Sequence, residues 1–470
     1  MRTLGPTSLL LLWGCAASAP DGAVSRSVPD GAVSRSGPDD AVSEFGPAPS
    51  WEAALDQAAR ALVDAGRAQS ISAAVVKNGR VWARAYGESS KGQSASVEGT
   101  FYEAGSVTKV FTALLLADAI ERGEVDADAR IRDLAPDLEV SDEVGAIRLV
   151  ALANHSSGLP RMPANFAPKD GTQPYVDYEL SRLWEALAET ELGPQRYTYS
   201  NFGMAVLGQL LARHAGQSYE ALLGMRVLEP LELSSLRLSP AEGDAQPYDE
   251  AGVPQPSWTF DAFAPAGALR ASAPALLRFV QAQLTSEDGQ GALASAMART
   301  QAQTTPLPGP GGIGLGWHID GQGRRWHNGQ TMGSHAFIGL KPGAFGVVVL
   351  SNTATPDLDR VGQAMLEILE GKPIELAFKP VVEVSEALLR RYVGEYLIQP
   401  TFSLSISLRD GRIYVQGTGQ PAFPLTPVGD HTFELSAVQA SGRFILPDEG
   451  PASALIWNQG GQSVRAQRRE

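Results

Sequence analysis

The spacing of apolar residues indicates a globular body that begins near Trp51. Apolar positions recur at helical spacing over 51–65, and the strand-like runs 70–76 and 81–86 flank Asn78-Gly79, which is typical of a strand, a turn and a second strand. Helical spacing then returns over three segments, 106–122, 178–191 and 204–215. The pattern predicts an antiparallel sheet that starts early in the chain and is followed by a cluster of helices.

Strand patterns reappear much later, at 334–340 and 345–352. The turn Lys341-Pro342-Gly343-Ala344 joins them into a hairpin. A helical pattern over 357–370 would close this part of the chain. We therefore expect an α/β (α+β) domain over 51–378, with one antiparallel sheet assembled from both ends of the segment, flanking helices and an all-helical cluster.

A second kind of pattern follows Lys379. Short strand-like runs repeat at intervals of roughly ten residues, at 392–398, 402–408, 412–416, 432–435 and 454–458. This spacing predicts a small C-terminal β-barrel over 384–470.

The N-terminus has the features of an export signal. Arg2 precedes the apolar run 8–13, and Gly14-Cys15-Ala16 follows it, so we assign 1–14 to a signal peptide. Cys15 is the chain's single cysteine, which excludes an intramolecular disulfide. Its position resembles the lipobox of bacterial lipoproteins, where the cysteine is lipidated; ordinary cleavage after Ala17-Ser18-Ala19 is the alternative, with Pro20 next to the cut.

A nine-residue unit, Pro-Asp-Gly-Ala-Val-Ser-Arg-Ser-Val, repeats within 20–46. The unit is rich in Pro, Gly, Ser and Asp and has no helical or strand period, so it lacks the apolar surface needed to fold alone. We expect 15–50 to form a disordered tether behind the lipidated cysteine.

Composition limits the classes of function. The 470 residues are 43% hydrophobic and 19% charged, which is normal for soluble globular proteins and long enough for two folded domains. The net charge of −14 argues against a nucleic-acid partner, because binding phosphates needs a basic surface. After the N-terminus, no stretch approaches the roughly 18 apolar residues of a transmembrane helix, which leaves lipidation as the predicted membrane attachment.

The sequence Ser106-Val107-Thr108-Lys109 carries the clearest chemical signal. A hydroxyl and an ammonium three residues apart at the start of a helix lie on one face, so a deprotonated Lys109 could take the proton of Ser106. The helix N-terminus would stabilise negative charge that develops nearby. The pair therefore predicts an activated serine nucleophile.

Two further motifs follow in order. Tyr199-Ser200-Asn201 precedes an apolar helical run about 90 residues after Lys109, and His327-Asn328-Gly329 precedes the late hairpin about 130 residues further on. Taken singly, Tyr199 could be a core tyrosine and Asn328-Gly329 a hairpin turn. Together with Ser-x-x-Lys, their order resembles the serine β-lactamase and penicillin-binding protein family, in the branch of class C β-lactamases, DD-peptidases and D-aminopeptidases.

The resemblance covers roughly 51–370 and implies a β-lactamase-like fold and a role for each motif. Ser106 would form an acyl-enzyme while Lys109 and Tyr199 transfer its proton, and no cofactor or metal is implied. The backbone N–H groups of Ser106 and Gln330 would form the oxyanion hole. Residues on the substrate side would be Asn201, His327, Gly329 and Gln330. His155, in the loop Asn154 to Pro160, is interpreted as a scaffold residue, not a general base.

His327 sets the expected substrate class. The lactamase pattern has a lysine at this position, whereas histidine is typical of the peptidase relatives, and its charge would change near neutral pH. We therefore predict a D-amino-acid-specific peptidase or DD-carboxypeptidase acting on cell-wall-type peptides, exported and anchored to a bacterial membrane by lipid only. A class C-like β-lactamase, an esterase and a non-catalytic penicillin-binding sensor are the alternatives.

Some members of the family carry a lipocalin-like C-terminal domain, which Tyr392 to Tyr396 and Gly417 to Pro421 resemble. The expected barrel would either cover and position the catalytic domain or bind a ligand of its own.

Overall fold

A computed structural model describes residues 50–286 and 289–469. The predicted signal peptide, the lipidation site Cys15 and the repeats of the tether lie outside the described residues. Within the described ranges, no helix combines the length and apolar character that crossing a bilayer requires.

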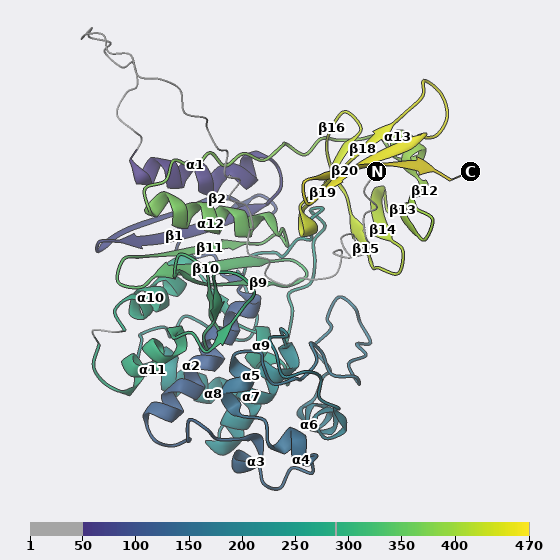
Figure 1. Ribbon diagram of the computed structural model, residues 1–470. Coiled ribbons are helices and arrows are strands. Elements are labelled where there is room, and N and C mark those ends of the chain that lie inside the picture. The colour runs from purple at the N-terminus through teal and green to yellow at the C-terminus, as the bar shows by residue number, and fades with distance from the viewer. Residues whose placement is uncertain (1–49, 287–288, 470) are drawn as a thin grey trace, which may run out of the picture.

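A nine-stranded antiparallel sheet forms the centre of the larger domain (Figure 1). Its strand order is β3-β2-β1-β11-β10-β9-β8-β7-β6, so β1 (Ser70–Lys77) pairs with β11 (Phe345–Ser351). The predicted assembly of one sheet from both ends of the segment is confirmed. The remaining strands are β2 (Arg80–Ser90), β3 (Gln93–Ser94), β6 (Thr305–Pro306), β7 (Gly312–Ile313), β8 (His318–Ile319), β9 (Arg325–Gln330) and β10 (His335–Lys341).

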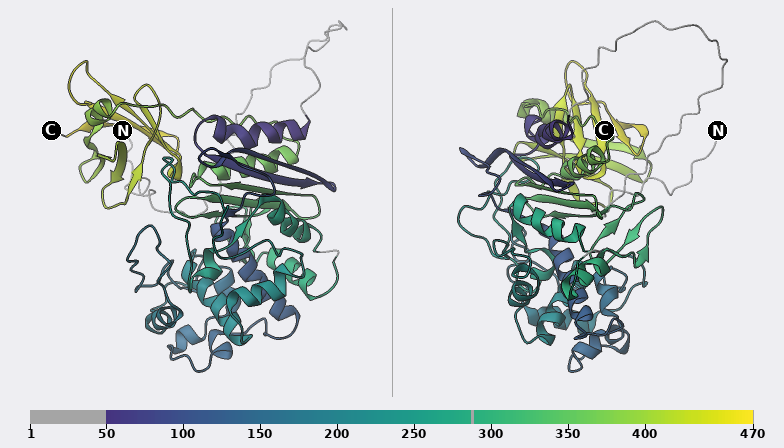
Figure 2. Two further views of the ribbon diagram at one scale, coloured as in Figure 1. Left: turned by 180° about the vertical axis from the view of Figure 1, so that it is seen from behind. Right: turned by 90° about the vertical axis from the view of Figure 1, so that its left-hand side faces the viewer.

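Helices cover both faces of the sheet, as the views in Figure 2 show. On one face α1 (Trp51–Asp64) and α12 (Asp357–Leu369) pack against alternate residues of the central strands, including Ala73 and Val75. The intervening Ala74 and Val76 join the core on the other face. Because β1 is buried on both faces, its residues from Ile71 to Val76 are all small or apolar.

The helical cluster lies below this sheet in Figure 1 and surrounds α2 (Thr108–Glu121), which is buried over most of its length. A 3₁₀ turn over Gly105–Val107 leads into α2. The other helices of this domain are α3 (Ile131–Leu134), α4 (Asp142–Gly145), α5 (Leu149–Ala153), α6 (Leu180–Glu189), α7 (Asn201–His214), α8 (Tyr219–Leu223), the π-helical turn Gly224–Leu228, α9 (Ala264–Gly267), α10 (Ala273–Leu284) and α11 (Ala292–Gln301). A short pair, β4 (Tyr102–Glu103) with β5 (Arg270–Ala271), lies just before the 3₁₀ turn.

The C-terminal region is a second nine-stranded sheet that curls into a nearly closed barrel, drawn in yellow-green in Figure 1. Its order is β15-β14-β13-β12-β20-β19-β18-β17-β16, with β15 and β16 at the two open edges. The interior is filled by aromatic side chains, among them Tyr392, Tyr396 and Phe444. The elements are α13 (Glu386–Tyr392), β12 (Gly394–Gln399), β13 (Phe402–Arg409), β14 (Arg412–Gly417), β15 (Ala422–Pro424), β16 (Thr426–Gly429), β17 (Thr432–Leu435), a 3₁₀ turn (Ser436–Val438), β18 (Ala440–Ile445), β19 (Ala454–Gln459) and β20 (Gln462–Arg468).

A buried arginine joins the two domains. Arg67 donates hydrogen bonds to Asp357 at 2.8 Å, to Glu434 of the barrel at 2.5 Å and to the Lys379 carbonyl at 3.0 Å. A second contact runs from Arg412 of β14 to the Ala251 carbonyl at 2.8 Å. The barrel is thus fixed both to the sheet layer and to the loop that precedes α9.

Candidate active site

Ser106 and Lys109 lie side by side at the start of α2. Ser106 belongs to the 3₁₀ turn, and Lys109 lies on the first turn of the α-helix. The Lys109 Nζ atom is 2.8 Å from the Ser106 Oγ atom and donates to the Ala266 carbonyl at 2.6 Å. The hydroxyl of Thr108 holds this junction, donating to the Gly105 carbonyl and accepting from the Leu269 N–H.

The environment of Lys109 favours a neutral amine. Its side chain is 0% exposed in the apolar middle of the helical cluster. Burial, with the positive charge of Arg161 nearby, lowers the pKa of Lys109 well below its ordinary value. A neutral amine has a lone pair, so at 2.8 Å it can accept the proton of the Ser106 hydroxyl.

Tyr199 is the third residue at this point. Its ring centroid lies 5.0 Å from Lys109 Nζ and 5.1 Å from the guanidinium carbon of Arg161. His155 packs on it with ring centroids 4.6 Å apart. The structure therefore brings Ser106, Lys109 and Tyr199 together, although they are far apart in sequence.

His155 holds the backbone beside Tyr199. It has a positive φ of 62°, its Nδ1 accepts from the Ser200 N–H at 3.2 Å, and its carbonyl accepts from the Thr198 N–H at 2.8 Å. Burial lowers the pKa of His155 well below its ordinary value, so its ring is neutral. These contacts fit the scaffold role expected from the sequence.

Strand β9 approaches the 3₁₀ turn closely at two glycines. A Cβ atom on Gly329 would lie 2.8 Å from the Ser106 nitrogen and closer still to the Ala104 carbonyl oxygen. Gly105 has a φ of +50°, and a Cβ there would lie 2.8 Å from the Gln330 nitrogen. Only glycine fits at Gly329, and the approach brings the backbones of Ser106 and Gln330 to the same edge of the site.

His327 differs from the expectation in its charge. It lies within β9, with its Nδ1 2.5 Å from the Asn328 carbonyl. It is 1% exposed, and burial with His318 and Lys109 nearby lowers its pKa well below the ordinary value. The expected change of charge near neutral pH is therefore wrong, because an imidazolium is too costly at this buried position.

The remaining predicted residues, Asn201 and Gln330, closely follow Tyr199 and Gly329 in the chain. Asn201 begins α7, with its N–H donating to the Arg161 carbonyl at 3.0 Å and its Nδ2 3.6 Å from the Met162 sulfur. Gln330 is exposed at the end of β9, and its side chain donates to the Ala354 carbonyl at 3.3 Å.

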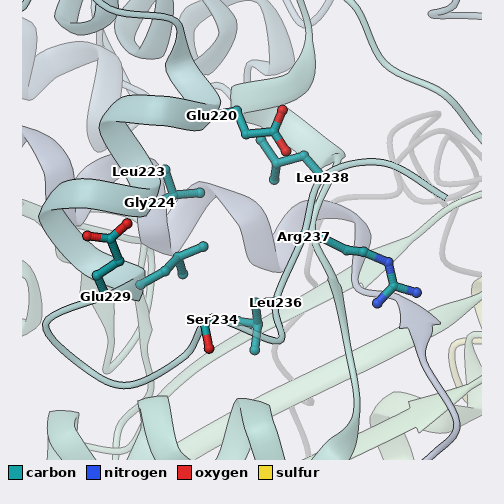
Figure 3. Close-up of a pocket in the computed structure, with 9 residues that line it drawn as sticks. Glu220, Leu223, Gly224, Glu229, Ser234, Leu236, Arg237 and Leu238 are labelled. Atoms are coloured by element: carbon teal, nitrogen blue, oxygen red, sulfur yellow. The ribbon is translucent and has the colours of Figure 1, made fainter. Parts of the chain in front are cut away.

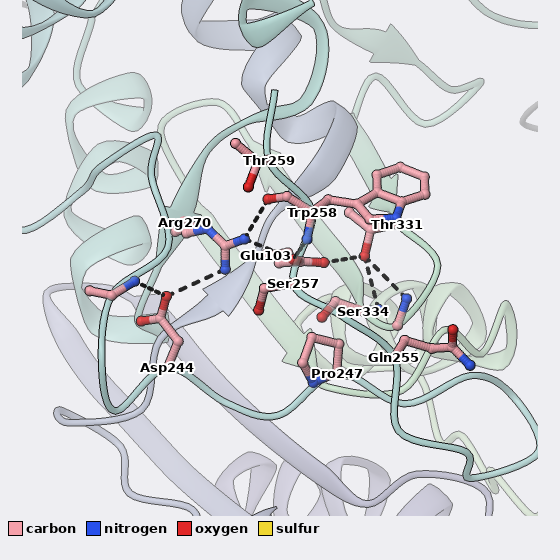
Figure 4. Close-up of polar contacts among 12 residues, drawn as sticks. Glu103, Asp244, Pro247, Gln255, Ser257, Trp258, Thr259, Arg270, Thr331 and Ser334 are labelled. Atoms are coloured by element: carbon pink, nitrogen blue, oxygen red, sulfur yellow. Dashed lines mark hydrogen bonds and ion pairs between the residues drawn. The ribbon is translucent and has the colours of Figure 1, made fainter. Parts of the chain in front are cut away.

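A buried polar network supports the edge formed by β9 (Figure 4). The Glu103 carboxylate accepts from Arg270 at 2.8 Å, from the Trp258 N–H at 2.7 Å and from the Thr331 hydroxyl. Thr331 follows Gln330 directly, and its oxygen also accepts from the N–H of Ser334 at 3.1 Å, within the turn to β10. Glu103 thus links the strand before Ser106 to the residue after Gln330.

A cavity of about 220 Å³ lies elsewhere, between α8 and the segment that follows the π-helical turn (Figure 3). Glu220, Ser234 and Arg237 are among its lining residues, and it contains none of the residues predicted for the site. We assign it no part in the chemistry of Ser106.

Two groups of this site were not predicted from the sequence. Arg161 directly follows the quoted loop Asn154 to Pro160, so its position beside the motif was the available signal. Glu103 stands three residues before Ser106, but its partners Arg270 and Thr331 are 167 and 228 residues away. A single sequence has no local pattern that reveals such a network.

Two family models match the chain. The model described as Beta-lactamase matches residues 55–372, and that of a domain of unknown function (DUF3471) matches residues 379–468.

Relatives and solved structures agree with the first match. A beta-lactamase of Pseudomonas fluorescens is 27% identical over 335 residues, covering 63% of this chain and 91% of the relative. Penicillin-binding protein 4 of Amycolatopsis lactamdurans is 27% identical over 326 residues, covering 63% of this chain and 84% of the relative. Penicillin-binding protein 4* of Bacillus subtilis is 23% identical over 396 residues, covering 77% of this chain and 86% of the relative.

The crystal structure of a class C beta lactamase from Rhodobacter sphaeroides has the same fold, with a TM-score of 0.59 and 22% identity over 68% of this chain and 98% of the other. A beta-lactamase structure from Sulfitobacter sp. EE-36 gives a TM-score of 0.60 at 24% identity, covering 69% of this chain and 98% of the other. The expected fold is confirmed. With two thirds of its length matched by the family model, this chain belongs to the Beta-lactamase family and is a serine hydrolase.

Proposed function

We propose that Ser106 is the nucleophile of a D-amino-acid-specific peptidase or DD-carboxypeptidase that acts on cell-wall-type peptides. The observation that best supports Ser106 as the nucleophile is the buried Lys109 amine, 2.8 Å from the Ser106 hydroxyl. We assign this chemistry to residues 51–378 and a positioning role to the barrel at 384–470.

The proposed reaction has two steps. The Ser106 oxygen attacks the substrate carbonyl while its proton passes to Lys109 or Tyr199, and this proton then goes to the leaving amine as the C–N bond breaks. A water molecule gives a proton to Tyr199, attacks the acyl-enzyme and releases the acid, and Ser106 regains a proton. The N–H groups of Ser106 and Gln330 stabilise the oxyanion in both steps, a role in which one donor is worth roughly 3 to 4 kcal/mol.

The peptide preference rests on His327. Because its ring is neutral, the site has no fixed cation at the position where the lactamase pattern has lysine. Asn201, at the start of α7, would hydrogen-bond the substrate amide, and Gly329 keeps the edge of β9 open to it. A β-lactamase is the second candidate, since relatives with that name match most of the catalytic domain.

A substrate panel tests this assignment on one purified sample. D-Ala-D-Ala peptides, D-aminoacyl anilides, p-nitrophenyl esters and nitrocefin would be compared by kcat/KM, and the peptides should rank first. The Ser106→Ala variant should stay folded and lose acylation by a fluorescent penicillin. Retained labelling would remove Ser106 from its role, and a higher kcat/KM for nitrocefin would make the enzyme a β-lactamase.

We also propose that the enzyme is exported and held at a bacterial membrane by a lipid on Cys15. The support is the sequence around this cysteine, with the repeat segment behind it serving as a tether. Cys15→Ser should move the protein from the membrane fraction to the soluble fraction of the export compartment. A wild-type protein that already fractionates as soluble would contradict the anchor.

A further inference from the structure

The ionisable groups around Tyr199 come from several elements. Arg161 and His155 face it from the loop before α6, Lys109 from α2, His327 from β9, and Tyr197 from its own segment. Burial lowers the pKa of Lys109, His155 and His327 well below their ordinary values. Among these described neighbours, Arg161 is the group whose positive charge is permanent, since a guanidinium does not lose its proton in proteins.

The backbone fixes Arg161 beside Tyr199. Its carbonyl accepts from the N–H groups of Asn201 at 3.0 Å and Phe202 at 3.2 Å, which are the first residues of α7 and directly follow the Tyr199 segment. The side chain is exposed, with its guanidinium carbon 5.1 Å from the Tyr199 ring centroid. Because the main chain holds the loop, replacing the side chain should leave the geometry of Tyr199 intact.

We propose that Arg161 is a positioning residue for Tyr199, whose guanidinium stabilises the phenolate form that takes up a proton during catalysis. The proposal rests on the proposed function of Tyr199 and deepens it. A unit positive charge held over the ring favours the phenolate over the neutral phenol, even at the high effective dielectric of a partly exposed site. Arg161 thus supplies beside Tyr199 the fixed cation that His327 does not supply.

The test measures the ionisation of Tyr199 directly. Tyrosinate absorbance is titrated in each protein and in its matched Tyr199→Phe variant, and the difference isolates this residue among the 11 tyrosines. Arg161→Gln should raise the apparent pKa of Tyr199 by about one unit at low salt, and Arg161→Lys should restore most of the shift. Since Arg161 is exposed, 0.5 M NaCl should reduce the difference.

A matched control is available in Arg182, whose guanidinium carbon lies 4.7 Å from the ring centroid of Tyr178. Arg182→Gln removes a cation from a tyrosine face in the same domain and should leave the Tyr199 titration unchanged. The pH profile of kcat/KM for an uncharged p-nitrophenyl ester should shift with the absorbance titration in Arg161→Gln alone.

Two results would overturn the proposal. One is an unchanged Tyr199 titration in a folded Arg161→Gln protein. The other is a change confined to the KM of carboxylate-bearing substrates, which would make Arg161 a substrate-binding residue. The absorbance titration needs no turnover, so its outcome is independent of whether Ser106→Ala confirms the proposed function.

Discussion

The close approach of β9 to the 3₁₀ turn leads to a quantitative prediction for Gly329→Ala. The added Cβ would lie 2.8 Å from the Ser106 nitrogen, whereas ordinary contact begins at 3.4 Å, so this contact alone requires a separation of 0.6 Å. The Ala104 carbonyl oxygen is nearer still and is also backbone, so the two segments must move further apart than this. The separation moves the N–H groups of Ser106 and Gln330 apart, and both are proposed donors to the oxyanion.

The expected loss is large in rate and moderate in stability. Misplacing or removing one oxyanion donor lowers kcat by roughly 10²- to 10³-fold. Overpacking of this kind costs about 1–3 kcal/mol of unfolding free energy, which lowers Tm by a few degrees. The measurements are kcat for a p-nitrophenyl ester under saturation and Tm by calorimetry on the same protein.

Gly339→Ala is the matched control in the neighbouring strand β10. Its Cβ would meet the Leu366 Cδ1 atom at 2.9 Å and the Phe337 Cε1 atom at 3.0 Å, which are side-chain atoms and belong to none of the predicted site residues. This variant should lose stability but keep its kcat. If Gly329→Ala lowers Tm as the control does and keeps full kcat, the approach of β9 to Ser106 has no part in catalysis.

Three further predictions concern other parts of the chain. Burial raises the pKa of Glu250 to about 7, so its neutral form is favoured in the folded state and the free energy of unfolding should fall by about 2–3 kcal/mol as pH rises from 4.5 through 7. Urea unfolding at pH 5 and pH 8 should show this fall, and Glu250→Gln should abolish it; equal pH dependence in the variant would contradict the assignment. Because His327 is already neutral, His327→Gln should leave the shape of the pH–rate profile between about 5.5 and 7.5 unchanged, and an inflection that disappears with the histidine would refute this. Deleting 384–470 should leave a domain that folds and still acylates, since the site residues lie before Leu340. Circular dichroism would reveal a loss of folding, and penicillin labelling would reveal a loss of acylation.

Much of the fold could be predicted because its elements carry local signals. The helix expected over 51–65 is α1 (Trp51–Asp64), and the strand expected over 345–352 is β11 (Phe345–Ser351). Strand β20 (Gln462–Arg468) was missed because its side chains are mostly polar and only Ala466 is buried, which leaves no alternating pattern. Its place in the barrel comes from backbone pairing with β12 and β19.

Only the site residues that belong to the sequence motifs could be predicted. Ser106 and Lys109 are neighbours on one helical turn, so their contact follows from spacing alone. The neutrality of His327 could not be predicted, because it depends on burial beneath neighbours such as His318. The contact between Arg161 and Tyr199 could not be predicted either, because the fold brings together two residues that are far apart in the sequence.

The pairing of β1 with β11 also bears on when the enzyme becomes active during its synthesis. Ile71 pairs with Ser351, so the central sheet is incomplete until nearly the whole domain has left the ribosome. At translation rates of about 5–20 residues per second, Gln330 emerges roughly 10–45 s after Ser106. During that interval Ser106 and Lys109 exist without β9, the strand that carries the second proposed oxyanion donor. Non-local pairing of this kind is also slow to form. Hydrolytic activity should therefore be among the last properties that a newly made chain acquires, and it reports completion of the sheet.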